Sequence, residues 1–166
     1  MPDTHMPIDT LANARALAPE LAARAAEMEE VRRLPADLAA KLAQAGVFRM
    51  ITPKSFGGLE LAPHDFVETV EAVATANASA GWCAMIGATT ALNATGSGDI
   101  EVKDIRVPKA RSVSLVSDEP HEKGPLFKFP AFGLLSLGVC AVALGNTRGS
   151  LDAFAALATA KKSQGS

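Results

Sequence analysis

The stretch PADLAAKLAQAGVFRMITPKSFGG, residues 35–58, contains a complete short helix and the start of the loop that follows it. Pro35 suits the first turn of a helix, and Leu38 and Leu42 lie on one face. Gly46 can adopt the positive φ that ends a helix. Two prolines and a Gly-Gly pair exclude one regular element over residues 47–65. We predict an ordered loop there, whose apolar side chains pack beneath neighbouring helices: Val47, Phe48, Met50, Ile51, Phe56 and Leu59.

Apolar residues at helical spacing continue on both sides of this stretch. Residues 10–31 are predicted to form either one helix kinked at Pro19 or two helical pieces. Asp65 is expected near the start of a second helix, whose inward face carries valines and a phenylalanine. Ser79 is the predicted cap of a third helix over residues 80–94. These elements indicate a helical bundle.

The C-terminal part of the chain contains its longest uncharged stretch, Phe129 to Asn146. This stretch is shorter than the roughly 20 residues of a membrane span and is interrupted by proline and glycine, so we expect a buried helix. Arg148 and Asp152 are predicted to form an exposed i, i+4 ion pair. One side of the helix carries small residues that favour close packing against another helix: Gly138, Ala141, Gly145 and Gly149.

The segment DIEVKDIRV, residues 99–107, has the alternation of a β-strand. Its apolar residues change phase in the middle, which predicts a β-bulge near Lys103 and Asp104. Residues 111–117, RSVSLVS, are the other plausible strand. Because an isolated hairpin is marginal, we hypothesise that it has an exposed edge or pairs with another chain.

Composition favours a mainly α protein of 166 residues. Aromatic residues make up only 5% of the chain and hydrophobic residues 48%. The net charge of -2 argues against nucleic acid and anionic membranes as partners. Cys83 and Cys140 lie in apolar runs, so we expect buried, reduced thiols. Without the pattern of a signal peptide, a cytoplasmic location is expected.

The order of these segments resembles the N-terminal helical domain of the acyl-CoA dehydrogenase superfamily. The strongest matches are AGVFRMITPKSFGG, residues 45–58, and the helix that begins SAGW, residues 79–82. TGSGDIEVKDIRVP, residues 95–108, resembles the last strand of that family's middle β-domain. The apolar helix after Phe129 resembles the first long helix of its C-terminal bundle. The chain is most similar to the flavin-dependent monooxygenase-like branch.

The resemblance implies three regions. Residues 1–94 correspond to the N-terminal helical domain, residues 95–118 to a remnant strand or hairpin of the middle domain, and residues 119–166 to a linker and the first helix of the C-terminal bundle. The rest of the β-domain, which in the family separates Ala94 from Thr95, is missing. The expected fold is therefore mainly α, a helical bundle with one long C-terminal helix and a small β-hairpin.

The resemblance also implies a function, that of a flavin-dependent oxidoreductase of the monooxygenase type. FAD or FMN would be the cofactor and a small molecule the substrate, although most of the flavin site is absent and binding by this chain alone is doubtful. One alternative is a non-catalytic helical remnant that associates with itself, as a homo-oligomer, or with a related chain. A small-molecule binding module without redox chemistry is the other. The region PAFGLLSLG, residues 130–138, lacks the acidic residue and arginine that hold a CoA ester in acyl-CoA dehydrogenases.

A mixed polar and apolar face is the candidate substrate pocket. Trp82, Met85, Thr89 and Asn93 follow one another at spacings of three, four and four residues, which places them on one side of a helix. In the resembling family this helix borders the substrate pocket. The alternative is that Trp82 and Met85 are core residues while Thr89 and Asn93 bond locally. No catalytic triplet and no metal site can be assembled, since the histidines are scattered: His5, His64 and His121.

Overall fold

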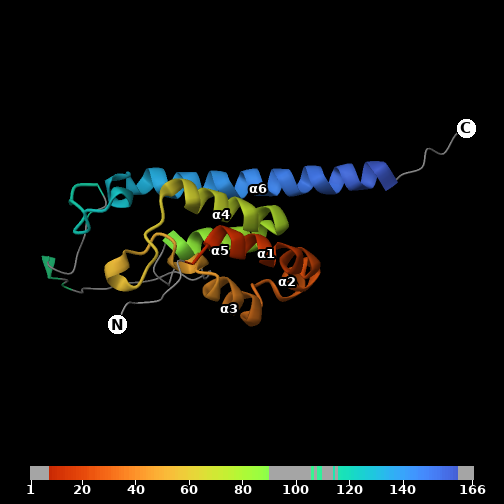
Figure 1. The fold of residues 1–166 in the computed structure, drawn as a ribbon, viewed down its shortest axis with the longest axis horizontal. Helices are drawn as coiled ribbons and strands as arrows, with labels where there is room; N and C mark the ends of the chain where they lie inside the picture. Colours follow the sequence, from red (N-terminus) through yellow and green to blue (C-terminus); the bar gives the residue numbers. More distant parts are fainter. Residues whose placement is uncertain (1–7, 90–105, 107, 110–113, 115, 161–166) are drawn as a thin grey trace, which may run out of the picture.

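The computed structural model describes residues 8–89, 106, 108–109, 114 and 116–160, and helices dominate this part of the chain (Figure 1). The mainly α class is confirmed. The elements are α1 (Thr10–Ala23), α2 (Ala25–Val31), α3 (Ala36–Gln44), the 3-10 turns η1 (Val47–Arg49) and η2 (Lys54–Phe56), α4 (Pro63–Ala76), α5 (Ala78–Thr89), the 3-10 turn η4 (Pro125–Lys128) and α6 (Ala131–Ala160).

Most of the predicted hairpin lies outside the described residues. Its last residues are described and form a turn: the backbone N–H of Asp118 donates to the carbonyl of Ser114 at 3.1 Å. The Asp118 carboxylate in turn accepts from the N–H of Ser114 at 2.8 Å. Because this side-chain bond satisfies backbone that a strand would pair, the end of the second predicted strand is a turn instead.

The N-terminal helical region is divided at Arg24. Asp9 caps α1, accepting from the N–H of Ala12 at 2.9 Å, and Pro19 lies inside the helix. The predicted alternatives both assigned the irregularity to Pro19, and the structure places it five residues later. The predicted helix after Pro35 is confirmed as α3, and Gly46 adopts φ 87° just beyond it.

The loop after α3 is ordered, as predicted. Its backbone folds back on itself, since the N–H of Leu59 donates to Arg49 and that of Leu61 to Met50, at 2.9 and 2.7 Å. Val47 and Met50 are fully buried. The prediction is wrong for Phe56, which is 78% exposed because η2 carries it away from the helices.

Helix α4 is the centre of the bundle and contacts α1, α5 and α6. It begins with Pro63, with Asp65 in its first turn as predicted, and buries Phe66, Val70 and Val73 completely. The predicted cap at Ser79 is wrong. Asn77 caps α5 instead, because its carboxamide oxygen accepts from the N–H of Ala80 at 2.9 Å.

Helix α6 lies along α4 and extends well beyond it (Figure 1). Its 30 residues correspond to a length of about 45 Å. The small-residue side faces the bundle as predicted: a Cβ built at Gly145 would lie 2.6 Å from the Cβ of Ala74, and one at Gly149 would lie 2.4 Å from the carbonyl oxygen of Thr75. Ala141, one turn before Gly145, is fully buried.

Two predictions about α6 are wrong. The helix is not buried overall, since only 22% of its most apolar window is covered by the rest of the structure. Length and composition alone would allow it to cross a membrane, which is weak evidence for doing so. Arg148 does not pair with Asp152 but with Glu71 of α4, at 2.9 Å, because the bundle lies on that side of α6.

Candidate functional site

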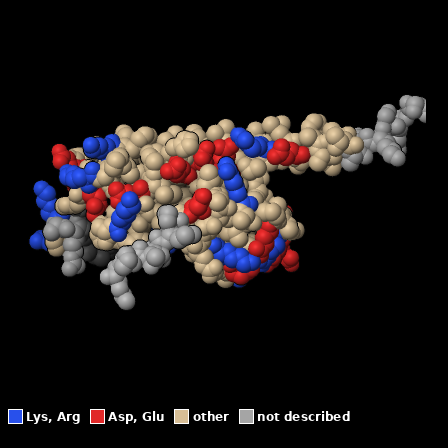
Figure 2. Space-filling model, in the orientation of Figure 1, with Lys and Arg blue, Asp and Glu red and all other residues tan. Residues whose placement is uncertain are grey.

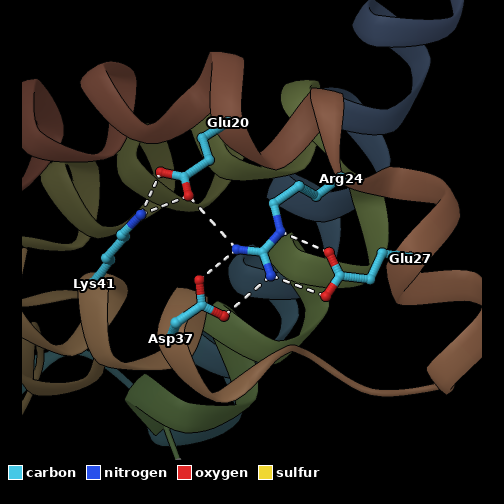
Figure 3. Close-up of polar contacts among 5 residues, drawn as sticks. All are labelled: Glu20, Arg24, Glu27, Asp37 and Lys41. Atoms are coloured by element: carbon cyan, nitrogen blue, oxygen red, sulfur yellow. Dashed lines mark hydrogen bonds and ion pairs between the residues drawn. The ribbon is translucent and has the colours of Figure 1, made fainter.

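A charged network joins α1, α2 and α3 (Figure 3). Arg24 donates from Nε and Nη2 to both carboxylate oxygens of Glu27, at 2.7 and 2.9 Å. Its Nη2 also donates to Asp37 at 3.1 Å. Lys41 donates to Glu20 at 2.8 Å, and the Glu20 carboxylate lies 3.6 Å from Arg24. The five side chains thus connect the end of α1 to both following helices.

The network is a structural feature, because each of its charged groups has at least one oppositely charged partner within it. Hydrogen bonds from Arg24 lower the pKa of both Glu27 and Asp37 below their ordinary values. The same two bonds raise the pKa of Arg24. Carboxylates held in their ionised form do not act as general acids near neutral pH. We therefore assign the network to helix packing rather than to catalysis.

Replacing Arg24 with Gln is expected to remove a pH-dependent part of the stability. Glu27 and Asp37 have lowered pKa values in the folded state, so their contribution is complete above the ordinary values of 4.5 and 3.8. It is lost as the pH falls through the lowered values. Melting temperatures of the two proteins should differ at pH 7, and the difference should shrink as the pH falls below the ordinary values. Arg33→Gln, in an exposed arginine with no ion pair among the described residues, is the control; a constant difference across pH would contradict this assignment.

A groove of about 530 Å³ lies between the α2–α3 connection and the start of α5. Trp82, 44% exposed, and Cys83 contribute from α5, while Met28 and Leu34 supply apolar surface. Burial raises the pKa of the half-buried Cys83 thiol, which keeps it protonated at neutral pH. The groove is lined by Met28, Glu29, Arg32, Arg33, Leu34, Ala78, Ser79, Ala80, Trp82 and Cys83.

The structure does not bring the three described residues of the predicted pocket, Trp82, Met85 and Thr89, into one cavity. Trp82 faces the groove, whereas Met85 is buried and lies against the α6 backbone at Gly138. The Thr89 hydroxyl donates to the carbonyl of Met85 at 2.9 Å. Asn93 lies outside the described residues. Met85 and Thr89 thus have the core and local roles of the alternative interpretation, and a part in substrate binding stays a prediction.

Sequence reasoning missed the two arginines at the groove, Arg32 and Arg33. The Arg-Arg pair before Leu34 was the available signal, but the sequence does not show that the chain turns there, with Arg32 at φ 49°. Cys140 is exposed, so its predicted burial is wrong. In the described part of the chain, no group of three or more His, Cys, Asp or Glu residues could hold a metal ion.

In the described part of the chain, these observations define a helical bundle that contains a short helix-and-turn unit, α3 followed by Gly46 and η1. Residues 9–111 match the family described as "Acyl-CoA dehydrogenase, N-terminal domain". The match covers more than half of the chain. The chain therefore belongs to the acyl-CoA dehydrogenase family through this N-terminal domain.

Curated relatives of the chain carry oxygenase names. It is 39% identical over 77 residues to the pigment production hydroxylase of Rhodococcus erythropolis, covering 46% of this chain and 20% of that protein. It is 39% identical over 71 residues to the flavin-dependent monooxygenase oxygenase subunit HsaA of Rhodococcus jostii, covering 43% and 19%. Indole-3-acetate monooxygenase of Pseudomonas putida is 40% identical over 65 residues, covering 39% and 17%.

The matched stretches are short relative to these proteins. Each spans about a fifth of the relative's length. The resemblance to a flavin-dependent oxidoreductase therefore holds at the level of the family and of its helical N-terminal domain.

Proposed function

We propose that this chain provides the N-terminal helical wall of a flavin-dependent, monooxygenase-type oxidoreductase that acts on a small molecule. The match of residues 9–111 to the family's N-terminal domain carries this proposal. The oxygenase names of the relatives support the reaction type. Two cysteines without a disulfide fit a reducing, cytoplasmic location.

In this proposal the chain alone does not hold FAD or FMN. A protein tunes a flavin by enclosing the ring and fixing hydrogen bonds to it. Ligand sites of this kind usually bury 70–90% or more of their ligand, and the groove beside Trp82 is an open depression on one side of the bundle. Flavin binding and the catalytic groups then come from polypeptide other than the described helices.

Flavin retention tests the proposal. The purified chain is mixed with FAD or FMN and passed through a gel-filtration column, and visible absorbance is recorded across the protein peak. A colourless peak is expected from this chain and a yellow one from a full-length relative treated in parallel. Trp82 is the chain's single tryptophan, so its fluorescence gives a second, site-specific reading. A stoichiometric yellow complex of this chain would contradict the proposal.

A non-catalytic interaction module is the second candidate function. The observation that favours it is the uncovered apolar surface of α6, which includes Leu144, Leu151, Phe154 and Leu157. Surfaces of this kind mark interaction sites in soluble proteins. On this alternative the helical body presents α6 to a partner and needs no flavin.

A further inference from the structure

One stripe of α6 combines exposure with coiled-coil spacing. Its six members recur at alternating intervals of three and four residues, and every one is exposed; we name them the α6 stripe: Leu137, Cys140, Leu144, Thr147, Leu151 and Phe154. Helices that pair along their length have apolar residues at this spacing. The stripe lies on a different side of the helix from Ala141 and Gly145, which pack against the bundle.

We propose that two copies of this chain pair through the α6 stripe in antiparallel orientation, with Leu137 of one copy beside Phe154 of the other. The same register places Cys140 beside Leu151 and Leu144 beside Thr147. This inference deepens the second candidate function by naming the partner and the surface.

The charge pattern of α6 suits a second copy. Arg148 and Asp152 are the only charged residues between Ala131 and Ala160. Arg148 bonds to Glu71 of α4, and Asp152, one turn further along, lies toward the same side of the helix. The stripe therefore has no charge, and two stripes can meet without burying an ionised group or opposing like charges. Along much of α6, the surface in Figure 2 is likewise uncharged.

The free end of α6 suits the antiparallel register. Residues 151–159 are all exposed and extend beyond the bundle (Figure 1). In the proposed pair this overhang lies along the first half of the partner's α6, where the stripe residues Leu137 and Cys140 are exposed. Each copy would then cover apolar surface that its own bundle leaves open.

Two of the three pairings in this orientation set a large side chain against a smaller one. Leu144 meets Thr147, and Leu151 meets Cys140, which is the alternation that fills a helix interface without voids. A parallel pair would set Cys140 against Cys140 and Thr147 against Thr147, leaving thin layers between the leucines. Antiparallel helix dipoles are also favourably arranged.

A lipid bilayer is a poorer occupant of this surface. The Arg148–Glu71 ion pair lies near the middle of α6 and fixes the helix to α4. If α6 crossed a membrane, this pair and the polar surface of α4 would lie at membrane depth, which is costly.

The expected pairing is weak. A helix about 45 Å long and about 10 Å wide has a flat footprint of about 450 Å². Stable interfaces typically bury about 800 Å² per partner. A dissociation constant in the micromolar range is therefore expected, which sets the protein concentrations of the test.

Sedimentation velocity of the full chain from about 1 to 300 μM tests the pairing. We expect a concentration-dependent dimer that Leu151→Glu weakens at least tenfold. Leu151 lies on the overhang, so the charge leaves the bundle's own packing intact. Ala153→Glu, two residues away on nearly the opposite side of the helix, is the matched control and should dimerise like the unchanged chain. Circular dichroism verifies that the variants fold.

Crosslinking tests the register. In a Cys83→Ser background, Leu151→Cys should form an intermolecular disulfide with Cys140 on mild oxidation, and removing Cys140 should abolish it. A disulfide between two Cys140 residues in the unchanged stripe would indicate parallel helices and overturn the proposed pair. A dimer insensitive to Leu151→Glu would overturn the stripe while leaving an interaction function standing. A chain that stays monomeric, or that floats with phosphatidylcholine vesicles through α6, would overturn pairing with a second copy, whatever the flavin measurement gives.

Discussion

Replacing Phe66 with alanine is expected to lower the free energy of unfolding by about 3–5 kcal/mol. Phe66 is completely buried, and its ring reaches across from α4 to the α6 backbone, where its Cζ lies 3.1 Å from a Cβ built at Gly138. Truncation would leave a cavity where these two helices meet, and neither backbone can close it without losing other contacts. Because small domains are stable by only about 5–15 kcal/mol, a large share of the stability would be lost.

Urea unfolding followed by circular dichroism measures this effect. Phe56→Ala is the matched control, the same substitution at a phenylalanine that is 78% exposed. It should change stability by less than about 0.5 kcal/mol. If the two substitutions had equal effects, the packing of α4 against α6 described here would be wrong.

The contrast between Phe66 and Phe56 also shows how far sequence reasoning extends. Phe66 belongs to a helix whose period-3.6 pattern fixes its inward face, so its burial follows from the sequence. Phe56 lies in a loop with two prolines and two glycines, where no period exists. Its direction depends on the fold of η2, and hydrophobicity alone gave the wrong prediction.

The wrong predictions for the cap of α5 and for the partner of Arg148 have a common cause: more than one residue could fill each role. Asn77 and Ser79 are both good capping residues, and the helix begins at the earlier one because the Asn77 side chain reaches the N–H of Ala80. Arg148 had one acidic partner visible by spacing, Asp152, and one on another helix, Glu71. Spacing rules describe a helix in isolation, so they cannot reveal a partner that tertiary packing supplies.

The candidate site was predictable only as a set of residues on one helix. The helical spacing of Trp82, Met85 and Thr89 placed them on a common side of α5. That side, however, borders several neighbouring elements. The α2–α3 connection leaves Trp82 open, while α6 covers Met85. The neighbours of each side chain follow from how the helices cross, which the sequence pattern does not determine.

Replacing Gly145 with alanine is expected to lower the free energy of unfolding by about 2 kcal/mol, although alanine is the better helix former. The intrinsic preference alone would raise stability by about 1 kcal/mol. A Cβ at this position, however, would lie 2.6 Å from the carbonyl oxygen of Glu71 and 2.8 Å from the backbone nitrogen of Thr75. Both atoms belong to the α4 backbone, so α6 itself must move, and overpacking of this kind costs about 3 kcal/mol.

Gly133→Ala, on the same helix, separates the helix preference of alanine from the cost of overpacking. A Cβ there would lie 3.1 Å from Cε1 of Phe129, the edge of a partly exposed ring that can rotate away. Without a backbone in the way, the helix preference should dominate, and stability should stay unchanged or rise by up to about 1 kcal/mol. Opposite signs for Gly145→Ala and Gly133→Ala in thermal unfolding would show that α6 is held against α4 by close backbone approach. A gain in stability at both glycines would mean that the two helices lie further apart than described.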